Sequence, residues 1–104
     1  MTYNGYVNYE TWNVSLWLNN DQGTNEYYDN LACEILDENE GDLDRTRYEL
    51  SNRIRDEITE YNPLGDQASM FSDLLNHALG MVEWAEVADS FVESAKEQRE
   101  NENE

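Results

Sequence analysis

Apolar side chains recur every three or four positions in four stretches of the chain, at about residues 25–37, 43–61, 67–79 and 83–97. This spacing places them on one face of a helix, and packed helices bury such a face. The stretch at 67–79 carries a strong face, which comprises Met70, Phe71, Leu74, Leu75, Ala78 and Leu79. The inner faces expected for the other stretches are Tyr28, Leu31, Ala32 and Ile35; Leu43, Leu50, Ile54, Ile58 and Tyr61; and Trp84, Val87, Ala88, Phe91, Val92 and Ala95. The pattern predicts a mainly α protein, a compact bundle of about four to five short helices.

Residues 9–20 fit two patterns. Trp12, Val14, Leu16 and Leu18 alternate with polar residues, which is the period of a strand. The rest of the chain offers no convincing second strand, and a lone strand leaves its backbone groups unpaired. By elimination we predict a short helix here, with an extended segment as the alternative.

Capping residues set the expected helix boundaries. Polar side chains that can accept a hydrogen bond from the first helical turn precede the first four helices: Asn8, Thr24, Asp42 and Asp66. Gly80 is typical of a C-cap. Residues 20–23 are expected to form a turn. The segment Asn62-Pro63-Leu64-Gly65 is expected to end the helix at residues 43–61, because proline cannot continue it.

The length of 104 residues fits one domain, which we expect to span residues 1–97. Residues 98–104 are polar and charged with nothing to bury, so they are expected to form a disordered acidic tail. The single cysteine, Cys33, allows no internal disulfide and favours a reducing compartment. No apolar run approaches the ~18 residues of a membrane span, and Met1 to Gly5 lack the features of a signal peptide. The expected location is the cytoplasm.

Charge narrows the class of partner. Twenty-four Asp and Glu oppose six Lys and Arg, which gives a formal net charge of -18. Direct binding to nucleic acid or to an anionic membrane is disfavoured, since both need Lys and Arg. A basic protein surface is favoured.

The charge is also unevenly distributed. Residues 1–44 contain ten acids and no Lys or Arg, and residues 56–95 contain nine acids and none. Four of the basic residues cluster on the helix expected at residues 43–61. There, i,i+4 spacing predicts the pairs Arg45/Glu49, Glu49/Arg53 and Arg53/Glu57. An ordinary soluble domain mixes its signs more evenly. A halophilic origin is a competing explanation, although thirteen asparagines and scarce alanines make it less attractive.

No recognisable catalytic constellation is present, so we expect a protein that is not an enzyme and needs no cofactor. The single histidine, His77, lies between core positions, and Cys33 has no nearby Lys or Arg to stabilise a thiolate. The acidic loop from Asp37 to Asp44 resembles a calcium loop only faintly. With Asp37 at position 1, position 6 is Asp42 instead of glycine and position 12 is Tyr48 instead of glutamate. We therefore predict no specific metal site.

The most suggestive pattern is a row of acids along the helix expected at residues 83–97 and the residues that follow it. Glu83, Glu86, Asp89, Glu93, Glu97, Glu100 and Glu104 are separated by three or four residues throughout. Their spacing places them on one face, opposite the apolar one, about 5–6 Å apart. Such a row can imitate the charge pattern of a DNA strand. The ordinary alternative is a solvated helix face that serves solubility alone.

Two blocks carry a family resemblance. The segment from Asn8 to Gly23, with the core W-x-V-x-L-W, resembles a motif, N-Y-E-T-W-N-V-x-L-W-L-x-N-D, of small uncharacterised proteins from phages and their relatives. Val82 to Ala88 is similar to the C-terminal helix of the same group. The resemblance implies a mobile-element setting, with the host cytoplasm as the location, and no known activity.

The aromatic residues of this motif have two interpretations. Trp12, Leu16 and Trp17 are expected to anchor the N-terminal segment in the core. Alternatively, Trp17 is an exposed anchor for a partner.

These observations predict a non-enzymatic inhibitor that blocks a host nucleic-acid-handling or defence complex as a DNA mimic. Its partner is expected to be the basic surface of a host protein or ribonucleoprotein. The predicted contacts are Glu83, Glu86, Asp89, Glu93, Glu97 and Trp17. The alternatives are a homodimer joined through aromatic residues, with charge serving solubility, or a protein that binds a small ligand or metal.

Overall fold

A computed structural model describes residues 2–65 and 67–102, and within them the chain forms five helices. Their bounds are Tyr9–Asn20 (α1), Gln22–Glu38 (α2), Leu43–Glu60 (α3), Met70–Gly80 (α4) and Trp84–Glu102 (α5). These residues form no strand, only an isolated bridge between Tyr3 and Tyr6. The predicted mainly α class is confirmed, and the ambiguous segment 9–20 is a helix.

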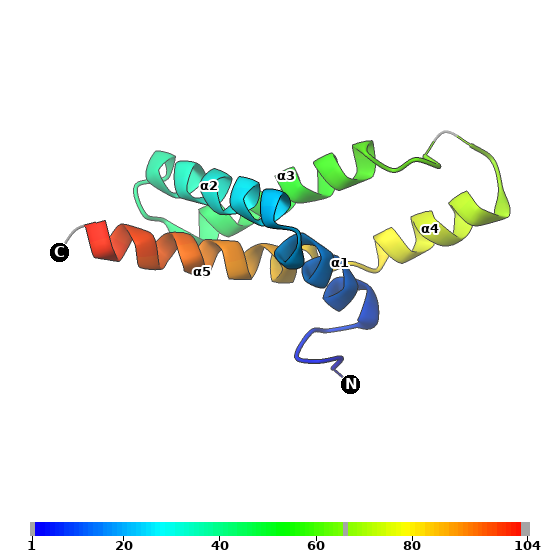
Figure 1. The fold of residues 1–104 in the computed structure, drawn as a ribbon, viewed down its shortest axis with the longest axis horizontal. Coiled ribbons are helices and arrows are strands. Elements are labelled where there is room, and N and C mark those ends of the chain that lie inside the picture. The colour runs from blue at the N-terminus through cyan, green and yellow to red at the C-terminus, as the bar shows by residue number, and fades with distance from the viewer. Residues whose placement is uncertain (1, 66, 103–104) are drawn as a thin grey trace.

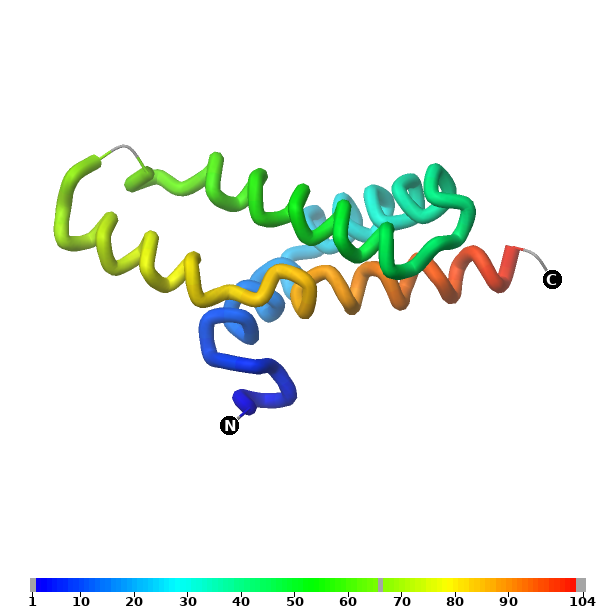
Figure 2. Tube along the Cα trace, turned by 180° about the vertical axis from the view of Figure 1, so that it is seen from behind, coloured from blue at the N-terminus to red at the C-terminus, as the bar shows by residue number. Residues whose placement is uncertain are grey.

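Three long helices form the body of the molecule. α2, α3 and α5 lie side by side and pack on one another, and α1 packs against α2 and α5 near their N-terminal ends (Figures 1 and 2). The C-terminal end of α3 extends past α2, and α4 lies beside this overhang. The molecule is therefore elongated, 53 × 30 × 24 Å, with α4 as an arm at one end.

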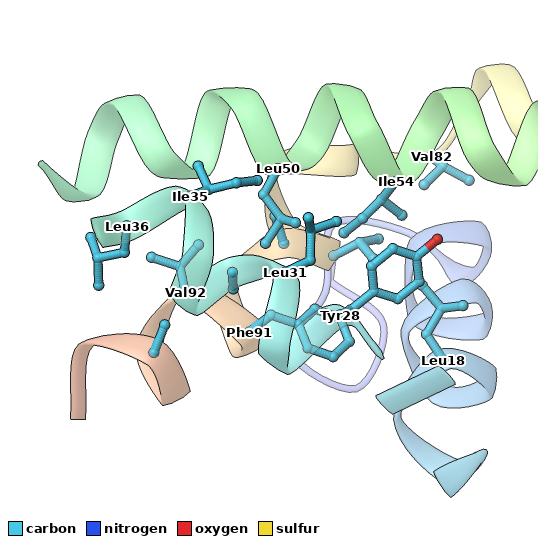
Figure 3. Close-up of a cluster of buried hydrophobic side chains, with 14 residues drawn as sticks. Leu18, Tyr28, Leu31, Ile35, Leu36, Leu50, Ile54, Val82, Phe91 and Val92 are labelled. Atoms are coloured by element: carbon cyan, nitrogen blue, oxygen red, sulfur yellow. The ribbon is translucent and has the colours of Figure 1, made fainter. Parts of the chain in front are cut away.

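The core lies between α2, α3 and α5, with Leu18 of α1 and Val82 closing one end (Figure 3). The largest fully buried apolar side chains come from these three helices: Leu36, Leu50, Ile54, Val87, Phe91 and Val92. The inner faces predicted for α2 and α5 are buried apart from the partly buried Trp84. On α3, Leu50 and Ile54 are buried, Leu43 and Ile58 are partly buried, and Tyr61 is exposed.

The prediction that the whole apolar face of α4 packs inward is wrong, because only Leu75, Ala78 and Leu79 of that face are partly buried. Met70, Phe71 and Leu74 are each about two-thirds exposed, and the helix buries only Ser72. The reason is the overhang of α3, because α4 returns along a part of α3 that the other long helices do not reach. The sequence pattern gives the face of a helix correctly and does not say whether another helix covers it.

Two predicted helix starts are also corrected. α2 begins at Gln22 and is capped by Asp21, whose carboxylate accepts a hydrogen bond from the Thr24 amide at 2.9 Å. α4 begins at Met70 and is capped by Ser69 instead of starting at residue 67; Asp66 lies outside the described residues. Gly80 is the last residue of α4 and not its cap, whereas Asp42 caps α3 as predicted.

α5 continues five residues past its predicted end. The tail expected from Gln98 is helical through Glu102, and residues 103–104 lie outside the described part. Arg99 forms an ion pair with Asp37 at 2.6 Å, and the Gln98 side chain accepts a hydrogen bond from the Cys33 thiol at 3.4 Å. These contacts with α2 hold a segment whose sequence offers no apolar anchor.

A polar network joins α1 to the connection between α4 and α5. The Asn8 side chain accepts hydrogen bonds from the Thr11 amide at 2.9 Å and hydroxyl at 2.7 Å, and it donates to the Met81 carbonyl at 2.7 Å. The fully buried Thr11 hydroxyl in turn accepts from the Glu83 amide at 2.9 Å. The side chains of Asn8 and Thr11, which form the N-x-x-T spacing in the first block of the sequence, thus cap α1 and fix its position on the body.

We expect the substitution Asn8→Ala to lower the free energy of unfolding by about 2 kcal/mol, since it removes a helix cap and leaves a partly buried network incomplete. Urea denaturation followed by circular dichroism measures this loss. Asn30→Ala is the matched control, because Asn30 is exposed on α2, where alanine is the better helix former. Equal losses in the two variants would contradict the role assigned to Asn8.

Candidate functional site

The predicted acidic face of α5 points into solvent over its C-terminal half, and Glu104, the last residue of the predicted row, lies outside the described residues. The apolar side of α5, from Val87 to Ala95, is buried against α2 and α3, and both helices lie on the same side of α5. Glu93, Glu97 and Glu100 occupy the opposite side and are exposed. We refer to these three residues as the α5 row. Successive carboxylates of the row are about 5 Å apart along the helix axis.

The predicted contacts upstream of the row differ in their surroundings. Glu83 is exposed. Glu86 is half-buried, and its carboxylate accepts hydrogen bonds from the Val7 amide at 3.0 and 3.3 Å, which fix the side chain in place. Asp89 forms an ion pair with Arg47. The charge of Asp89 is therefore compensated, unlike those of Glu93 and Glu97.

Arginines neutralise only a minority of the acids. The five arginines form ion pairs with six acids, namely Asp37, Asp44, Glu49, Asp56, Glu57 and Asp89. Two of the twenty-four acids lie outside the described residues, which leaves sixteen without an ion-pair partner in the described part. The outer surface therefore carries a strong negative field.

Two of the three pairs predicted on α3 are formed. Arg45 contacts Glu49 at 3.2 Å, and Arg53 contacts Glu57 at 2.7 Å. The predicted pair between Glu49 and Arg53 is absent from the ion pairs of the described residues. Glu49 instead accepts a second hydrogen bond from Asn39 at 3.2 Å.

Trp17 is one of the most exposed apolar side chains, at 69%. In a helix, the inward positions of this segment are Thr11, Ser15 and Leu18, so the expected burial of Leu16 and Trp17 is wrong. Trp12 is partly buried and packs against Tyr3 and Tyr9, with ring centroids 5.0 and 5.6 Å apart. Trp17 has the exposure that a partner anchor requires.

A cleft of about 380 Å³ lies where α1, α2 and α3 meet, lined by Leu18, Gly23, Thr24, Tyr27, Tyr28, Glu57, Ile58 and Tyr61. The two oxygens of Glu57 accept hydrogen bonds from the hydroxyls of Tyr27 at 2.8 Å and Tyr28 at 3.0 Å, and Arg53 donates to the first of these oxygens at 2.7 Å. Sequence reasoning missed this cluster because its members are about thirty residues apart.

The cluster shifts the pKa values of its members. Burial, reinforced by the Glu57 carboxylate, raises the pKa of Tyr28, which stays protonated as a donor. Burial opposes ionisation of Glu57, but hydrogen bonds from Arg53, Tyr27 and Tyr28 outweigh it and hold the pKa of Glu57 below its usual value. The carboxylate of Glu57 accepts hydrogen bonds from Tyr27 and Tyr28 of α2 and from Arg53 of α3, so the cluster links α2 to α3. We call it the polar clamp.

We expect the contribution of Glu57 to stability to depend on pH. A lowered pKa in the folded state means that the ionised form stabilises the fold above pH 4.5, and this stability is lost as the pH falls through the lower folded value. The stability difference between wild type and Glu57→Gln is therefore largest near neutral pH and shrinks below pH 4.5. Urea denaturation across this range measures it, with the exposed Glu60→Gln as the control. A difference that does not change with pH would contradict the clamp.

The remaining candidates for chemistry are Cys33 and the acidic loop from Asp37 to Asp44, and the surroundings of neither favour a reactive or metal-binding site. Burial, together with the nearby acids Asp29 and Asp37, raises the pKa of the Cys33 thiol, which disfavours the reactive thiolate. In the acidic loop, Asp37 pairs with Arg99 and Asp42 caps α3. Within the described residues, no three His, Cys, Asp or Glu side chains are grouped so that they can hold a metal ion.

Residues 1–101 match the family of unknown function DUF7249. The chain belongs to this family. The match covers the middle of the chain as well as the two blocks at residues 8–23 and 82–88, and it spans all five helices except the last residue of α5, Glu102. Curated proteins and solved structures give no match to the chain. No described helix of this DUF7249 protein is long and apolar enough to cross a membrane.

Proposed function

We propose that this protein acts without catalysis, by binding and blocking a host complex that handles nucleic acid or defends the cell. The complex is of the kind used in restriction or CRISPR defence. The α5 row is the observation that carries the proposal, because its three carboxylates face solvent at regular spacing and have no ion-pair partner among the described residues. The phage-like motif at residues 8–23 supports a mobile-element origin and a place in the host cytoplasm.

The mechanism is competition for a basic surface. From Glu86 to Glu100 the acidic side of α5 is about 21 Å long. Arginines and lysines that normally bind phosphates would contact these carboxylates. Attraction between opposite charges speeds the encounter and weakens as salt screens it. Because the row lies on a rigid helix packed along one side, the acids are presented in a fixed line with little ordering cost.

Trp17 supplies a second kind of contact in this proposal. An exposed tryptophan can insert into a pocket of the partner and be fully desolvated there, which gives affinity that salt does not remove. The α5 row then sets the rate and specificity of binding, and Trp17 slows dissociation.

Affinity capture tests the proposal. The immobilised protein is expected to retain a nucleic-acid-handling complex from a host lysate at low salt and to release it as salt rises. A protein carrying Glu93→Lys, Glu97→Lys and Glu100→Lys is expected to retain much less of it. Capture that is indifferent to both salt and charge reversal, or that retains only proteins unrelated to nucleic acid, would refute the proposal.

A further inference from the structure

α4 lies at the end of the molecule opposite the C-terminal half of α5 (Figure 1), and it leaves an apolar face uncovered. Four side chains make up this face, which we call the α4 face: Met70, Phe71, Leu74 and Met81. Their exposed fractions are between 45% and 65%. Helical spacing brings the first three together on one side of α4, and Met81 follows directly at its end.

A shallow cleft adjoins this face. α1 and α4 diverge from the hydrogen bond between Asn8 and Met81, and between them lies a cleft of about 130 Å³. Its lining is mostly apolar and comprises Tyr9, Glu10, Asn13, Val14, Leu75, Ala78, Leu79 and Val82. The molecule thus presents an apolar ridge and an apolar hollow beside each other.

The area available suits a second copy of the chain. A phenylalanine covers about 150–250 Å² when it is wholly buried, and Met and Leu lie near the lower part of that range, so the four side chains at these exposures offer roughly 400 Å². The smallest stable interfaces need about 500 Å² from each partner. The α4 face with part of the adjoining cleft reaches this area. In a two-fold dimer, each copy offers the same surface, and the ridge of one can enter the cleft of the other.

The charge distribution also favours a second copy over a basic partner. Residues 61–82 contain two acids, Asp66 and Asp73, and no Lys or Arg, and the cleft adds one more acid, Glu10, in a chain whose net charge is -18. This is where two like-charged copies meet with the least repulsion. A basic partner would instead be attracted to the acids of α2 and α5.

We infer that the α4 face and the α1–α4 cleft form the interface of a homodimer. The dimer leaves both α5 rows exposed, because the rows lie toward the other end of the molecule, and it does not depend on the function proposed above. Its affinity is modest, with a dissociation constant of about 100 µM, as expected for a small interface between like-charged partners. Salt strengthens it, which is the opposite of its expected effect on a basic partner.

Analytical ultracentrifugation of the whole chain tests this inference. The mass is expected to rise from 12.2 kDa toward twice that value between about 10 and 500 µM, with tighter association at about 500 mM NaCl than at 50 mM. Phe71→Ser is expected to weaken the dimer at least tenfold. Tyr48→Ser is the matched control, because Tyr48 is as exposed as Phe71 but lies on α3, and it is expected to leave the dimer unchanged.

Leu74→Gln provides a second variant that keeps a good helix former in α4, and circular dichroism confirms the fold of each protein. It is also expected to weaken the dimer at least tenfold. A protein that stays monomeric at every concentration and salt, or a dimer unaffected by both variants, would overturn the inference. Binding of a basic amphipathic peptide to the α4 face without self-association would assign the face to another partner and overturn it as well.

Discussion

Phe91→Ala is expected to lower the free energy of unfolding by about 3–5 kcal/mol, the usual cost of emptying a large buried aromatic position. Phe91 is 1% exposed and lies in the core between α2, α3 and α5, where its ring centroid is 5.7 Å from that of Tyr28. Small domains are stable by only about 5–15 kcal/mol, so this loss brings the protein close to unfolding. Thermal and urea denaturation followed by circular dichroism measure the effect.

Phe71→Ala is the matched comparison for Phe91→Ala, because it makes the same substitution on α4, outside the core. Phe71 is 65% exposed on α4, and Phe71→Ala is expected to change the stability of the monomer by less than about 0.5 kcal/mol. The two variants remove the same atoms from the same kind of helix, so the difference between them reports burial. Similar losses at both positions would show that α4 packs into the core, which would contradict the fold and remove the basis of the dimer.

Reversing the α5 row is expected to weaken binding to a basic ligand about 100-fold. The variant carries Glu93→Lys, Glu97→Lys and Glu100→Lys, and the probe is a twelve-residue polyarginine peptide at low salt. Each reversed residue removes one attraction and adds one repulsion. A cost of about 1 kcal/mol per position then sums to roughly 3 kcal/mol, which corresponds to about 100-fold in affinity. Fluorescence anisotropy of the labelled peptide measures this change.

A second triple variant with the same net charge controls for the overall field. Glu26→Lys, Glu38→Lys and Glu60→Lys change exposed acids on α2 and α3 that have no ion-pair partner among the described residues. Because these positions are scattered, the loss of affinity is expected to stay below about tenfold. If the two triple variants lose affinity equally, net charge alone would explain binding and the α5 row would have no special role.

The sequence predicts the helices well because their periodicity directly reflects burial. The core faces of α2 and α5 follow from spacing alone, as Leu31, Ile35, Val87 and Phe91 show. The acidic side of α5 follows by the same reasoning, because solvent lies opposite the buried side. Such local regularities need no knowledge of where the other helices lie.

Apart from the helix starts of α2 and α4, which are local capping errors, the differences from the prediction share one physical origin, since each depends on which elements meet in space. Phe71 lies on a well-formed apolar face that the other helices do not cover. Asp89 belongs to the predicted acidic series, yet Arg47, forty-two residues away, neutralises it. Glu57 is part of a regular i,i+4 pair, and only the fold adds Tyr27 and Tyr28 to it. Spacing within one helix contains no information on these contacts.

In the proposed mechanism, the acids of α5 compete with phosphates for a basic surface. The most direct measurement mixes the complex captured from host lysate with a fluorescent DNA duplex and titrates it with this protein while anisotropy is recorded. The wild-type protein is expected to release the duplex, with a potency that falls as salt rises, whereas the reversed α5 row releases little. A duplex that stays bound while the protein also binds the complex would place the two on different surfaces and contradict the claim.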